Sequence, residues 1–328
     1  MRTRDFGRTG RMVSDIGFGA WAIGADWGHV EPDDAVAALN EALDKGVTFI
    51  DTADVYGDGR SEQLIAQVLK ARGGERPFVA TKAGRRLPKQ TVEGYTAENL
   101  SAWTDRSLKN LGVDTLDLVQ LHCPPTALYH RAEVFGRLDD LVTAGKIRAY
   151  GVSVEKVEEA MMALDYPGVA SVQIIFNIFR QKPIEAFLKA AQEKKVAIIA
   201  RVPLASGLLS GKFKPDTVFE PSDHRQYNRH GEAFDVGETF SGVSYAEGLK
   251  AVEAIRPLVG GDISMAQFAL RWILMFDAVT VAIPGAKNAA QARANTDAAS
   301  LPALSPDVMT ELKSIYDRDI RPSVHQRW

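Results

Sequence analysis

The chain has 328 residues, of which 45% are hydrophobic and 25% are charged, an ordinary composition for a globular protein. Its 39 basic and 42 acidic residues give a net charge of −3, so we expect neither a nucleic acid nor a membrane surface as partner. The single cysteine, Cys123, excludes an internal disulfide framework and is typical of a reducing compartment. No apolar run is long enough for a signal core or a membrane span, which predicts a cytoplasmic protein.

The predicted elements begin with a β-hairpin over Arg4–Val13, where Gly7 and Gly10 supply the turn. Short apolar runs then predict strands at Ile16–Ala20, Val47–Ile50, Pro77–Ala80, Leu116–Leu121, Ile147–Val152, Val172–Phe176, Val196–Ala200 and Val279–Ile283. Between them, apolar residues at helical spacing predict buried stripes: Val36, Leu39 and Leu43; Leu100, Trp103 and Leu111; Val134, Leu138, Leu141 and Val142; and Ile184, Phe187, Leu188 and Ala191. We expect the second of these helices to begin near Thr96 and to end at Gly112.

Eight strands, each followed by a helix, favour a single (β/α)8 barrel domain over residues 1–328 rather than an open doubly wound sheet. Two segments exceed the repeating unit. One is the stretch Ala205–Ser244 after the seventh barrel strand, and the other is a C-terminal helix near Pro306–Asp319 with the tail Ile320–Trp328. A loop of this length in a compact domain usually has a function, so we expect Ala205–Ser244 to be a lid or a binding loop.

One motif suggests a different fold. Gly17-Phe-Gly-Ala-Trp-Ala22 matches the G-x-G-x-x-A dinucleotide fingerprint and follows a predicted strand. The motif should open a helix, whereas Trp21–Gly28 is expected to form a loop. The next acidic residue at a strand end, Asp51, also lies far beyond the usual spacing of about 20 residues. We therefore do not expect a Rossmann site.

In a parallel barrel, active residues gather at the carboxyl ends of the strands. Those ends carry Trp21, Asp51, Lys82, His122, Ser153, Gln173 with Asn177, Arg201 and Gly285. Tyr56 follows Asp51 in a glycine-rich turn. Each residue alone has another interpretation, because Asp51 can cap a helix, Lys82 can form a surface salt bridge and His122 can be a hydrogen-bonded core histidine. Together they predict a polar cluster at one mouth of the sheet.

This cluster suits the reduction of a carbonyl group. A phenol such as Tyr56 can give a proton to the oxygen as hydride reaches the carbon, but its ordinary pKa of about 10 is poorly matched to neutral pH. We expect the Lys82 ammonium to lower that pKa and Asp51 to act as counter-ion to the lysine. A neutral His122 can donate a hydrogen bond that orients the carbonyl.

The segments Val47–Gly57, Ala80–Lys82, Leu121–His122, Gly151–Ser153 and Ile283–Gly285 resemble the aldo-keto reductases, NAD(P)H-dependent (α/β)8-barrel oxidoreductases. The long-loop subgroup, similar to bacterial general-stress reductases and potassium-channel β-subunits, is the nearest match. The resemblance implies NADPH as cofactor and Tyr56 as general acid, with Asp51, Lys82 and His122 in the roles described above.

The resemblance also implies cofactor contacts. Ser153 and Gln173 match the pair that holds the nicotinamide carboxamide, Pro203–Lys212 matches the pyrophosphate loop, and Gly285–Asn295 matches the segment at the 2′-phosphate and adenine. The full predicted set is Trp21, Asp51, Ser153, Gln173, Arg201, Pro203, Leu204, Ser206, Gly207, Leu208, Ser210, Lys212, Arg225, Gly285, Lys287, Gln291 and Asn295. Four positions depart from the family pattern: Val154 replaces Asn or Arg, Arg201 a stacking aromatic, Lys287 a small polar residue and Ala294 a glutamate.

The predicted substrate residues are Trp21, Trp27, Tyr56, His122 and Asn177, with Arg85, Tyr227 and the C-terminal tail as weaker candidates. Aromatic and polar groups together favour a polyhydroxylated aldehyde, such as a sugar or sugar-acid carbonyl, and hence a role in carbohydrate metabolism. The alternative is a nucleotide-sensing interaction protein with slow turnover. An oligomer is possible but is not predicted.

Two other kinds of site are not expected. Cys123 and His122 should point to opposite faces of their strand, so a packed thiol is favoured over a nucleophile–base pair. The six histidines show no paired ligand spacing, so no metal is predicted.

Overall fold

The computed structural model describes residues 1–24 and 27–328, and eight parallel strands form its centre. They are β3 (Phe18–Gly19), β4 (Phe49–Asp51), β5 (Phe78–Ala83), β6 (Leu118–His122), β7 (Tyr150–Ser153), β8 (Val169–Ile175), β9 (Ala197–Arg201) and β10 (Val281–Ala282), each hydrogen-bonded to the next. Isolated parallel bridges pair Ile16 with Ala282 and Gly19 with Gly285, which joins the first strand to the last. The predicted (β/α)8 barrel is confirmed.

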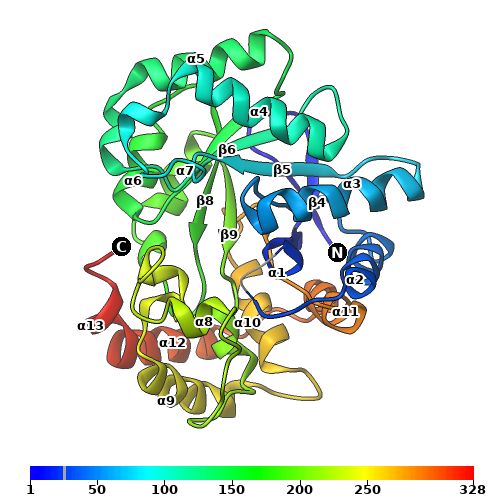
Figure 1. Ribbon diagram of the computed structural model, residues 1–328. Coiled ribbons are helices and arrows are strands. Elements are labelled where there is room, and N and C mark those ends of the chain that lie inside the picture. The colour runs from blue at the N-terminus through cyan, green and yellow to red at the C-terminus, as the bar shows by residue number, and fades with distance from the viewer. Residues whose placement is uncertain (25–26) are drawn as a thin grey trace.

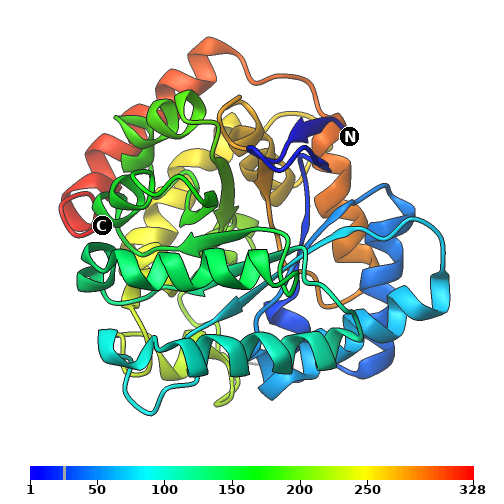
Figure 2. The ribbon, with the colours of Figure 1, turned by 90° about the horizontal axis from the view of Figure 1, so that it is seen from above.

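Helices surround this sheet (Figures 1 and 2). They are α1 (Trp21–Gly24), α2 (Pro32–Asp44), α3 (Arg60–Arg72), α4 (Ala97–Leu111), α5 (Ala132–Thr143), α6 (Val157–Ala163), α7 (Phe187–Glu193), α8 (His224–Tyr227), α9 (Tyr245–Ile255), α10 (Met265–Leu274), α11 (Ala289–Asp297), α12 (Pro306–Ile315) and α13 (Arg321–Val324). In Figure 1, α2 and α11 pack together beside the N-terminus, while α9 and α12 lie at the bottom of the view. Among the described residues, none of the helices is long and apolar enough to cross a membrane.

Capping residues determine where helices such as α4 begin and end. The side chain of Thr96 accepts a hydrogen bond from the Asn99 N–H at the start of α4, and Gly112 ends the helix with a φ of 64°. Two predicted core positions are wrong, because Val142 and Ile184 are 37% and 38% exposed. Val142 lies in the last turn of α5, and Ile184 lies in a 3-10 turn before α7, so neither faces the barrel.

The N-terminal hairpin covers the end of the barrel opposite to the strand carboxyl ends. Its strands, β1 (Thr3–Asp5) and β2 (Met12–Ser14), pair antiparallel, as predicted. Phe6, in the hairpin, packs its ring 5.3 Å from that of Phe49 and 4.8 Å from that of Phe78. These rings join Val13, Leu118, Ile199, Val281 and other apolar residues in a buried group that fills this end.

The glycines of the apparent dinucleotide motif serve strand packing. A Cβ at Gly19 would lie 2.6 Å from the Ile283 carbonyl oxygen, so only glycine lets the first and last strands meet there. The following residues Trp21–Gly24 form one turn of helix, so the loop predicted for Trp21–Gly28 is wrong over α1. The motif lies in a closed parallel barrel, and the rejection of a Rossmann site agrees with this fold. Ala25 and Asp26 lie outside the described residues.

The long loop 205–244 contains α8 and 3-10 turns at Ala205–Ser210, Val236–Glu238 and Phe240–Gly242. The C-terminal segment packs against it, since the indole N–H of Trp328 donates to Asp235 at 2.9 Å and the Arg180 guanidinium lies over the indole. The predicted helix Pro306–Asp319 is present, because the π turn Tyr316–Ile320 continues α12 directly and leads into α13, so the first residues of the predicted tail are helical as well. The assignment of residues 1–328 to one domain stays a prediction.

Candidate active site

Lys82 is the centre of the polar cluster at the strand carboxyl ends. Its Nζ donates to Asp51 Oδ2 at 2.5 Å, to the Thr52 carbonyl at 2.9 Å and to the Tyr56 hydroxyl at 3.2 Å. The rings of Tyr56 and His122 meet edge to face, with centroids 5.9 Å apart. All of these side chains are buried, Lys82 to 99%. The structure therefore brings the four predicted catalytic residues together.

The backbone explains why these residues meet. Asp51, Lys82 and His122 lie at or near the ends of the neighbouring strands β4, β5 and β6, where the parallel register brings their side chains to one mouth. Tyr56 reaches the same place through the turn Tyr56–Gly59, in which Gly57 and Gly59 have φ values of 59° and 97°. A Cβ at Gly57 would lie 2.5 Å from the Gly24 carbonyl, so the turn requires glycine.

Electrostatics hold the lysine charged and the phenol neutral. Burial, the largest single effect, lowers the pKa of Lys82, but the charges and hydrogen bonds of Asp51 and Tyr56 together outweigh it and the net pKa is raised. For Tyr56, burial raises the pKa more than Lys82 lowers it, and Asp51 adds to the increase. This corrects the expectation that lysine brings the phenol pKa down from its ordinary value. The Lys82 charge is largely offset by Asp51, so its effect on the phenol is smaller than that of burial.

His122 is a neutral imidazole, as the sequence analysis expects. Burial, reinforced by the positive charges of Arg85, Lys82 and Arg201, holds its pKa well below the usual value. Within the part of the chain that the structure describes, its Nδ1 atom has no hydrogen-bond partner. A buried nitrogen of this kind is expected to find a partner when the site is in use.

Two glutamines hold the far oxygen of Asp51. The amide of Gln173 donates to Asp51 Oδ1 at 2.7 Å, and the amide of Gln120 donates to the same atom at 3.1 Å. In this structure Gln173 is thus engaged by the predicted catalytic carboxylate rather than free for a carboxamide. Gln120 was not among the predicted site residues, although a polar residue inside the apolar run Leu116–Leu121 was a usable signal.

An aromatic wall adjoins Tyr56. Trp21 stacks on Tyr56 with ring centroids 6.0 Å apart, and it meets Trp27 edge to face at 5.5 Å. His224, from the long loop, lies 4.7 Å from Trp21 and 4.5 Å from Trp27, while Phe234 lies 5.9 Å from Trp21. Of the predicted pair, Trp21 therefore contacts Tyr56 directly, whereas Trp27 is reached through Trp21 and His224. His224 and Phe234 were missed because nothing in the loop sequence fixes where its side chains lie.

The remaining predicted substrate residues lie in different surroundings. Asn177 is fully buried, and its amide donates to the Val202 carbonyl and to Ser241 Oγ while its oxygen accepts from the Phe179 N–H. Its polar atoms are thus engaged within the protein, so the structure does not place it in a pocket wall. Tyr227 meets Phe234 edge to face at 6.3 Å. The tail residue Trp328 packs on the long loop rather than on the aromatic wall.

Two cations, Lys287 and Arg225, lie close together at the predicted 2′-phosphate position. Burial lowers the pKa of Lys287, and the positive charge of Arg225 lowers it further. Lys287 Nζ donates to the Trp27 carbonyl, while Arg225 Nε donates to Asp223 at 2.8 Å. Asp223 accepts from Arg225 through both of its oxygens and partly offsets these charges, so a phosphate bound here would share the arginine with that carboxylate.

The other predicted cofactor segments are ordered by internal bonds. In Pro203–Lys212, the N–H groups of Gly207 and Gly211 donate to backbone carbonyls of the same turn, and Ser206 Oγ donates to the Glu238 carbonyl. Gln291 accepts from the Lys287 N–H, and Asn295 donates to the Gly285 carbonyl, so both hold the turn that carries Lys287. Lys212 is exposed, while Ser153 is buried with its hydroxyl 3.4 Å from the Cys123 sulfur.

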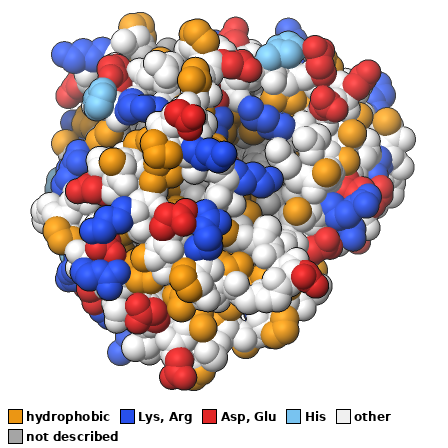
Figure 3. Space-filling view, turned by 90° about the horizontal axis from the view of Figure 1, so that it is seen from below, with side chains coloured by type: hydrophobic (Ala, Val, Ile, Leu, Met, Phe, Trp, Pro, Cys, Tyr) orange, Lys and Arg blue, Asp and Glu red, His pale blue; other side chains and the backbone are white. Residues whose placement is uncertain are grey.

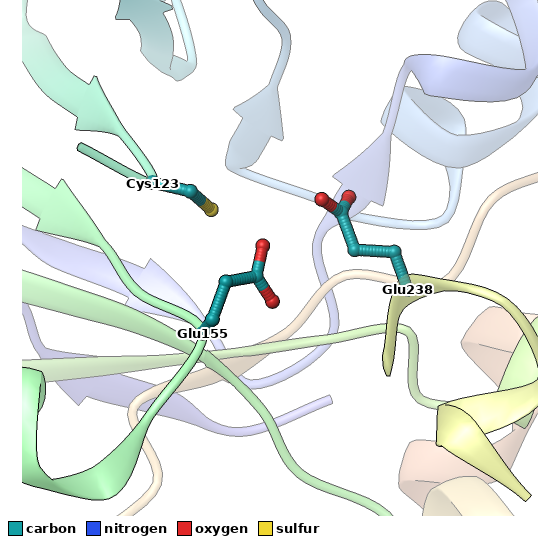
Figure 4. A group of neighbouring side chains, drawn as sticks. All are labelled: Cys123, Glu155 and Glu238. Carbon is teal, nitrogen blue, oxygen red and sulfur yellow. The ribbon is translucent and has the colours of Figure 1, made fainter. Parts of the chain in front are cut away.

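A further group of possible metal ligands lies beside this site. One ligand atom from each of Cys123, Glu155 and Glu238 lies within 4.8 Å of the others, and Figure 4 shows the three side chains pointing toward one another. Both carboxylates already pair with Arg85 and Arg201, and burial raises the pKa of the Cys123 thiol, so it stays protonated. Two fixed positive charges and a neutral thiol make this a poor site for a cation.

Two hollows mark the surface of the molecule. Figure 3, which views the molecule from below, shows Lys and Arg side chains gathered around a hollow near the middle of the face, with Asp and Glu beside them. A separate open groove of about 710 Å³ lies between the hairpin and the C-terminal end of α3. None of the predicted site residues lines that groove, so we do not connect it with the chemistry.

Comparison with known proteins agrees with the geometry. The model of the aldo/keto reductase family matches residues 15–317. The chain belongs to the aldo/keto reductase family. It is 31% identical to aldo-keto reductase YhdN of Bacillus subtilis over 87% of this chain and 85% of that protein. It is also 27% identical to a probable voltage-gated potassium channel subunit beta of Arabidopsis thaliana, over 96% of each chain.

A solved structure gives the same fold. The glycerol dehydrogenase AKR11B4 from Gluconobacter oxydans superposes with a TM-score of 0.74 and 27% identity, over 94% of this chain and 93% of that chain. The prediction of an aldo-keto reductase, an NAD(P)H-dependent oxidoreductase, is therefore confirmed at the level of the family.

Proposed function

We propose that the chain reduces an aldehyde or ketone to the alcohol with NADPH and that Tyr56 is the proton donor. The observation that carries this proposal is Lys82 Nζ lying between the Asp51 carboxylate and the Tyr56 hydroxyl. A buried cation in contact with a phenol stabilises the phenolate that remains after proton transfer. The neutral, buried His122 beside the phenol supports the proposal further.

Each side chain then has one task. NADPH, when bound, supplies the hydride that goes to the carbonyl carbon. Tyr56 donates its hydroxyl proton to the carbonyl oxygen, and His122 donates a hydrogen bond to the same oxygen and orients it. Lys82 stabilises the charge that develops on the phenol oxygen, while Asp51 keeps the lysine protonated in a site removed from water. Trp21 and Trp27 help to exclude water from the reacting groups.

The cofactor contacts are also proposals. Lys287 and Arg225 would hold the 2′-phosphate, because they place two positive charges side by side. Ser153 and Arg201, which end β7 and β9, and Gln173, two residues before the end of β8, would lie nearest the nicotinamide, and the turn Ala205–Ser210 would lie along the pyrophosphate. The remaining predicted contacts are kept as proposals.

For the substrate we propose a polyhydroxylated aldehyde, such as a sugar or sugar-acid carbonyl. Aromatic rings beside charged and amide groups support this class, and so does the similarity to a glycerol dehydrogenase. The second candidate function is a nucleotide-binding interaction protein with slow turnover, which the 27% identity to a potassium channel subunit supports. The polar cluster at the strand ends is compatible with either function.

A measurement of NADPH oxidation decides between the two candidate functions. We expect NADPH absorbance to fall in the presence of DL-glyceraldehyde, aldoses and hydroxyaldehydes, with a kcat in the ordinary enzyme range of about 1–10³ s⁻¹. Absence of measurable NADPH oxidation across that panel and aromatic aldehydes, together with tight NADPH binding by fluorescence titration, would favour the interaction protein instead.

A further inference from the structure

Four charged side chains form a closed ring of ion pairs at the mouth of the barrel. Arg85 Nη2 lies 2.5 Å from Glu238 Oε1 and 3.4 Å from Glu155 Oε1. Arg201 Nη2 lies 2.8 Å from Glu155 Oε2, and its Nη1 lies 3.3 Å from Glu238 Oε2. Each guanidinium thus contacts both carboxylates. All four side chains are at most 19% exposed, so this is a built site and not a surface pairing.

The ring joins two parts of the chain. Arg85 follows β5, Glu155 follows β7 and Arg201 ends β9, so these three belong to the barrel, whereas Glu238 belongs to the long loop. The barrel side has two positive charges and one negative charge. Burial raises the pKa of Glu155, which favours its protonated form and makes the barrel side still more positive. The loop carboxylate is therefore the anion that neutralises a cationic subsite.

Glu238 is held as an anion. Burial alone would raise its pKa, but Arg85 and Arg201 outweigh that effect and the pKa is lowered. Two guanidiniums are a good match to a carboxylate, because planar N–H groups can donate to both oxygens. The chemistry of the subsite is thus that of carboxylate recognition, whichever molecule supplies the carboxylate.

The subsite adjoins the reacting groups. Arg85 and Arg201 both lower the pKa of His122 through their charges, and Glu238 raises that of Tyr56. The Arg85 guanidinium lies 6.0 Å from the ring of Phe234, which belongs to the aromatic wall. A molecule with its carbonyl at Tyr56 therefore lies within reach of this pair of arginines.

We propose that Arg85 and Arg201 form a carboxylate subsite of the substrate pocket, filled by Glu238 in this structure and by a substrate carboxylate during turnover. The inference rests on the proposed reductase function and narrows its substrate class to carbonyl compounds that carry a carboxylate. Binding then exchanges one buried carboxylate for another, so the guanidiniums are never left unpaired. A neutral aldehyde cannot make this exchange, and Glu238 stays in place beside it.

The test compares substrates that differ only at the end remote from the carbonyl. Succinic semialdehyde and butanal have the same four-carbon chain, and D-glucuronate and D-glucose form a second pair. We expect kcat/KM for the carboxylate member to exceed that of its partner by roughly 10- to 100-fold, the value of a charge-assisted contact. Glu238→Gln removes the internal competitor and should raise this ratio by about tenfold. Arg85→Gln should bring the ratio close to one.

The matched control is Arg86→Gln, the adjacent arginine, which pairs with the exposed Asp58 outside the ring. The Arg86→Gln variant should have the same ratio of kcat/KM between the carboxylate substrate and its neutral partner as the parent protein. A purely structural ring predicts that Glu238→Gln and Arg85→Gln change both members of a pair in parallel, and an unchanged ratio in both variants would overturn the subsite. Reduction of butanal and glucose without a carboxylate preference would also overturn it while leaving the reductase proposal intact.

A binding measurement keeps the two proposals separate. Succinate, which has no reducible carbonyl, should change the tryptophan fluorescence saturably, because Trp21 lies beside the pocket. Its Kd should fall by about tenfold in Glu238→Gln and rise by at least as much in Arg85→Gln. Circular dichroism confirms that both variants are folded. Equal succinate affinity in the parent and in Arg85→Gln would contradict the subsite even if no aldehyde were reduced.

Discussion

The two ends of the barrel interior are both buried, yet they are built from opposite kinds of side chain. At the hairpin end, Phe6, Phe49 and Phe78 pack ring against ring with aliphatic neighbours. At the mouth, Asp51 and Lys82 form an ion pair that two glutamines support, and the ring of Arg85, Glu155, Arg201 and Glu238 lies beside it.

The apolar end stabilises the fold, whereas the charged mouth holds the groups that are proposed to react. Burial of the hairpin end is favourable in proportion to its apolar area. Burial of the mouth costs free energy unless every charge has a partner, and a well-paired buried ion pair is often no better than an apolar replacement. We infer that the favourable free energy of burying the apolar end offsets the desolvation cost of the charged groups at the other end. Substitutions at the mouth should therefore change both stability and turnover, whereas substitutions at the hairpin end should change stability alone.

The largest combined effect is expected for Lys82→Met at the mouth. The change leaves Asp51 buried with no cation, so the free energy of unfolding should fall by about 3–5 kcal/mol, and turnover should be lost with it. Urea unfolding and NADPH oxidation measure the two effects. Lys70→Met, at an exposed position of α3, is the control and should change neither. An unfolding free energy unaltered by Lys82→Met would show that the two residues are not a buried pair.

Phe6→Ala probes the opposite end. The ring is fully buried, so its removal should lower the free energy of unfolding by about 3–5 kcal/mol while kcat of the folded protein is retained. Met12→Ala, in the same hairpin but 50% exposed, should have little effect on stability. A fall in kcat for Phe6→Ala at a temperature where the variant is fully folded would contradict the separation of the two ends.

Asp54 makes the mouth sensitive to pH. It is fully buried, neither carboxylate oxygen has a partner among the described residues, and burial followed by Glu62 raises its pKa to about 7. Between the unfolded pKa of about 4 and the folded one, only the folded state binds this proton, so stability falls as pH rises. Asp54→Asn should therefore gain stability relative to the parent as pH rises from 4 to 8, by up to about 4 kcal/mol.

Chemical unfolding at several pH values tests this expectation. The control is Asp58→Asn, because Asp58 is exposed and pairs with Arg86 and Arg106, so its removal should not stabilise the protein at high pH. If the stability difference between Asp54→Asn and the parent is independent of pH, the buried carboxyl does not titrate in this range.

Lys287→Ala is expected to have the smallest effect, confined to the cofactor. KM for NADPH should rise by roughly 10- to 100-fold, because a charge-assisted contact with the 2′-phosphate is lost, while KM for NADH should barely change. Arg293→Ala removes an exposed cation from α11 that pairs with Glu41, and it should affect neither dinucleotide. An equal rise for NADPH and NADH would show that Lys287 does not recognise the phosphate.

The residues that the sequence could predict are those whose place follows from strand order. Asp51, Lys82 and His122 stand at the ends of apolar runs, and parallel strands bring such ends to one mouth. Thr96 and Gly112 marked the ends of α4 because caps act within a few residues. These inferences depend on the local sequence pattern and on the rule that parallel strands bring their carboxyl ends to the same side of the sheet.

Other features depend on contacts that no local pattern encodes. Glu238 joins Arg85 across 153 positions of sequence, and it comes from a loop without periodicity. The direction of the Gln173 amide, toward Asp51 rather than a cofactor, depends on the side chains packed around it. The net pKa shift of Tyr56 required the balance of burial against two neighbouring charges, which the sequence does not give.

The central claim, that Tyr56 gives the proton, is tested most directly by Tyr56→Phe. This change removes only the hydroxyl that contacts Lys82, so kcat should fall by about 10²–10⁴ while the Kd for NADPH, from fluorescence titration, stays nearly constant. Tyr150→Phe, at another buried barrel tyrosine whose hydroxyl bonds to Asp139, is the control and should leave kcat in place. Turnover in Tyr56→Phe equal to that of the parent protein would contradict the claim.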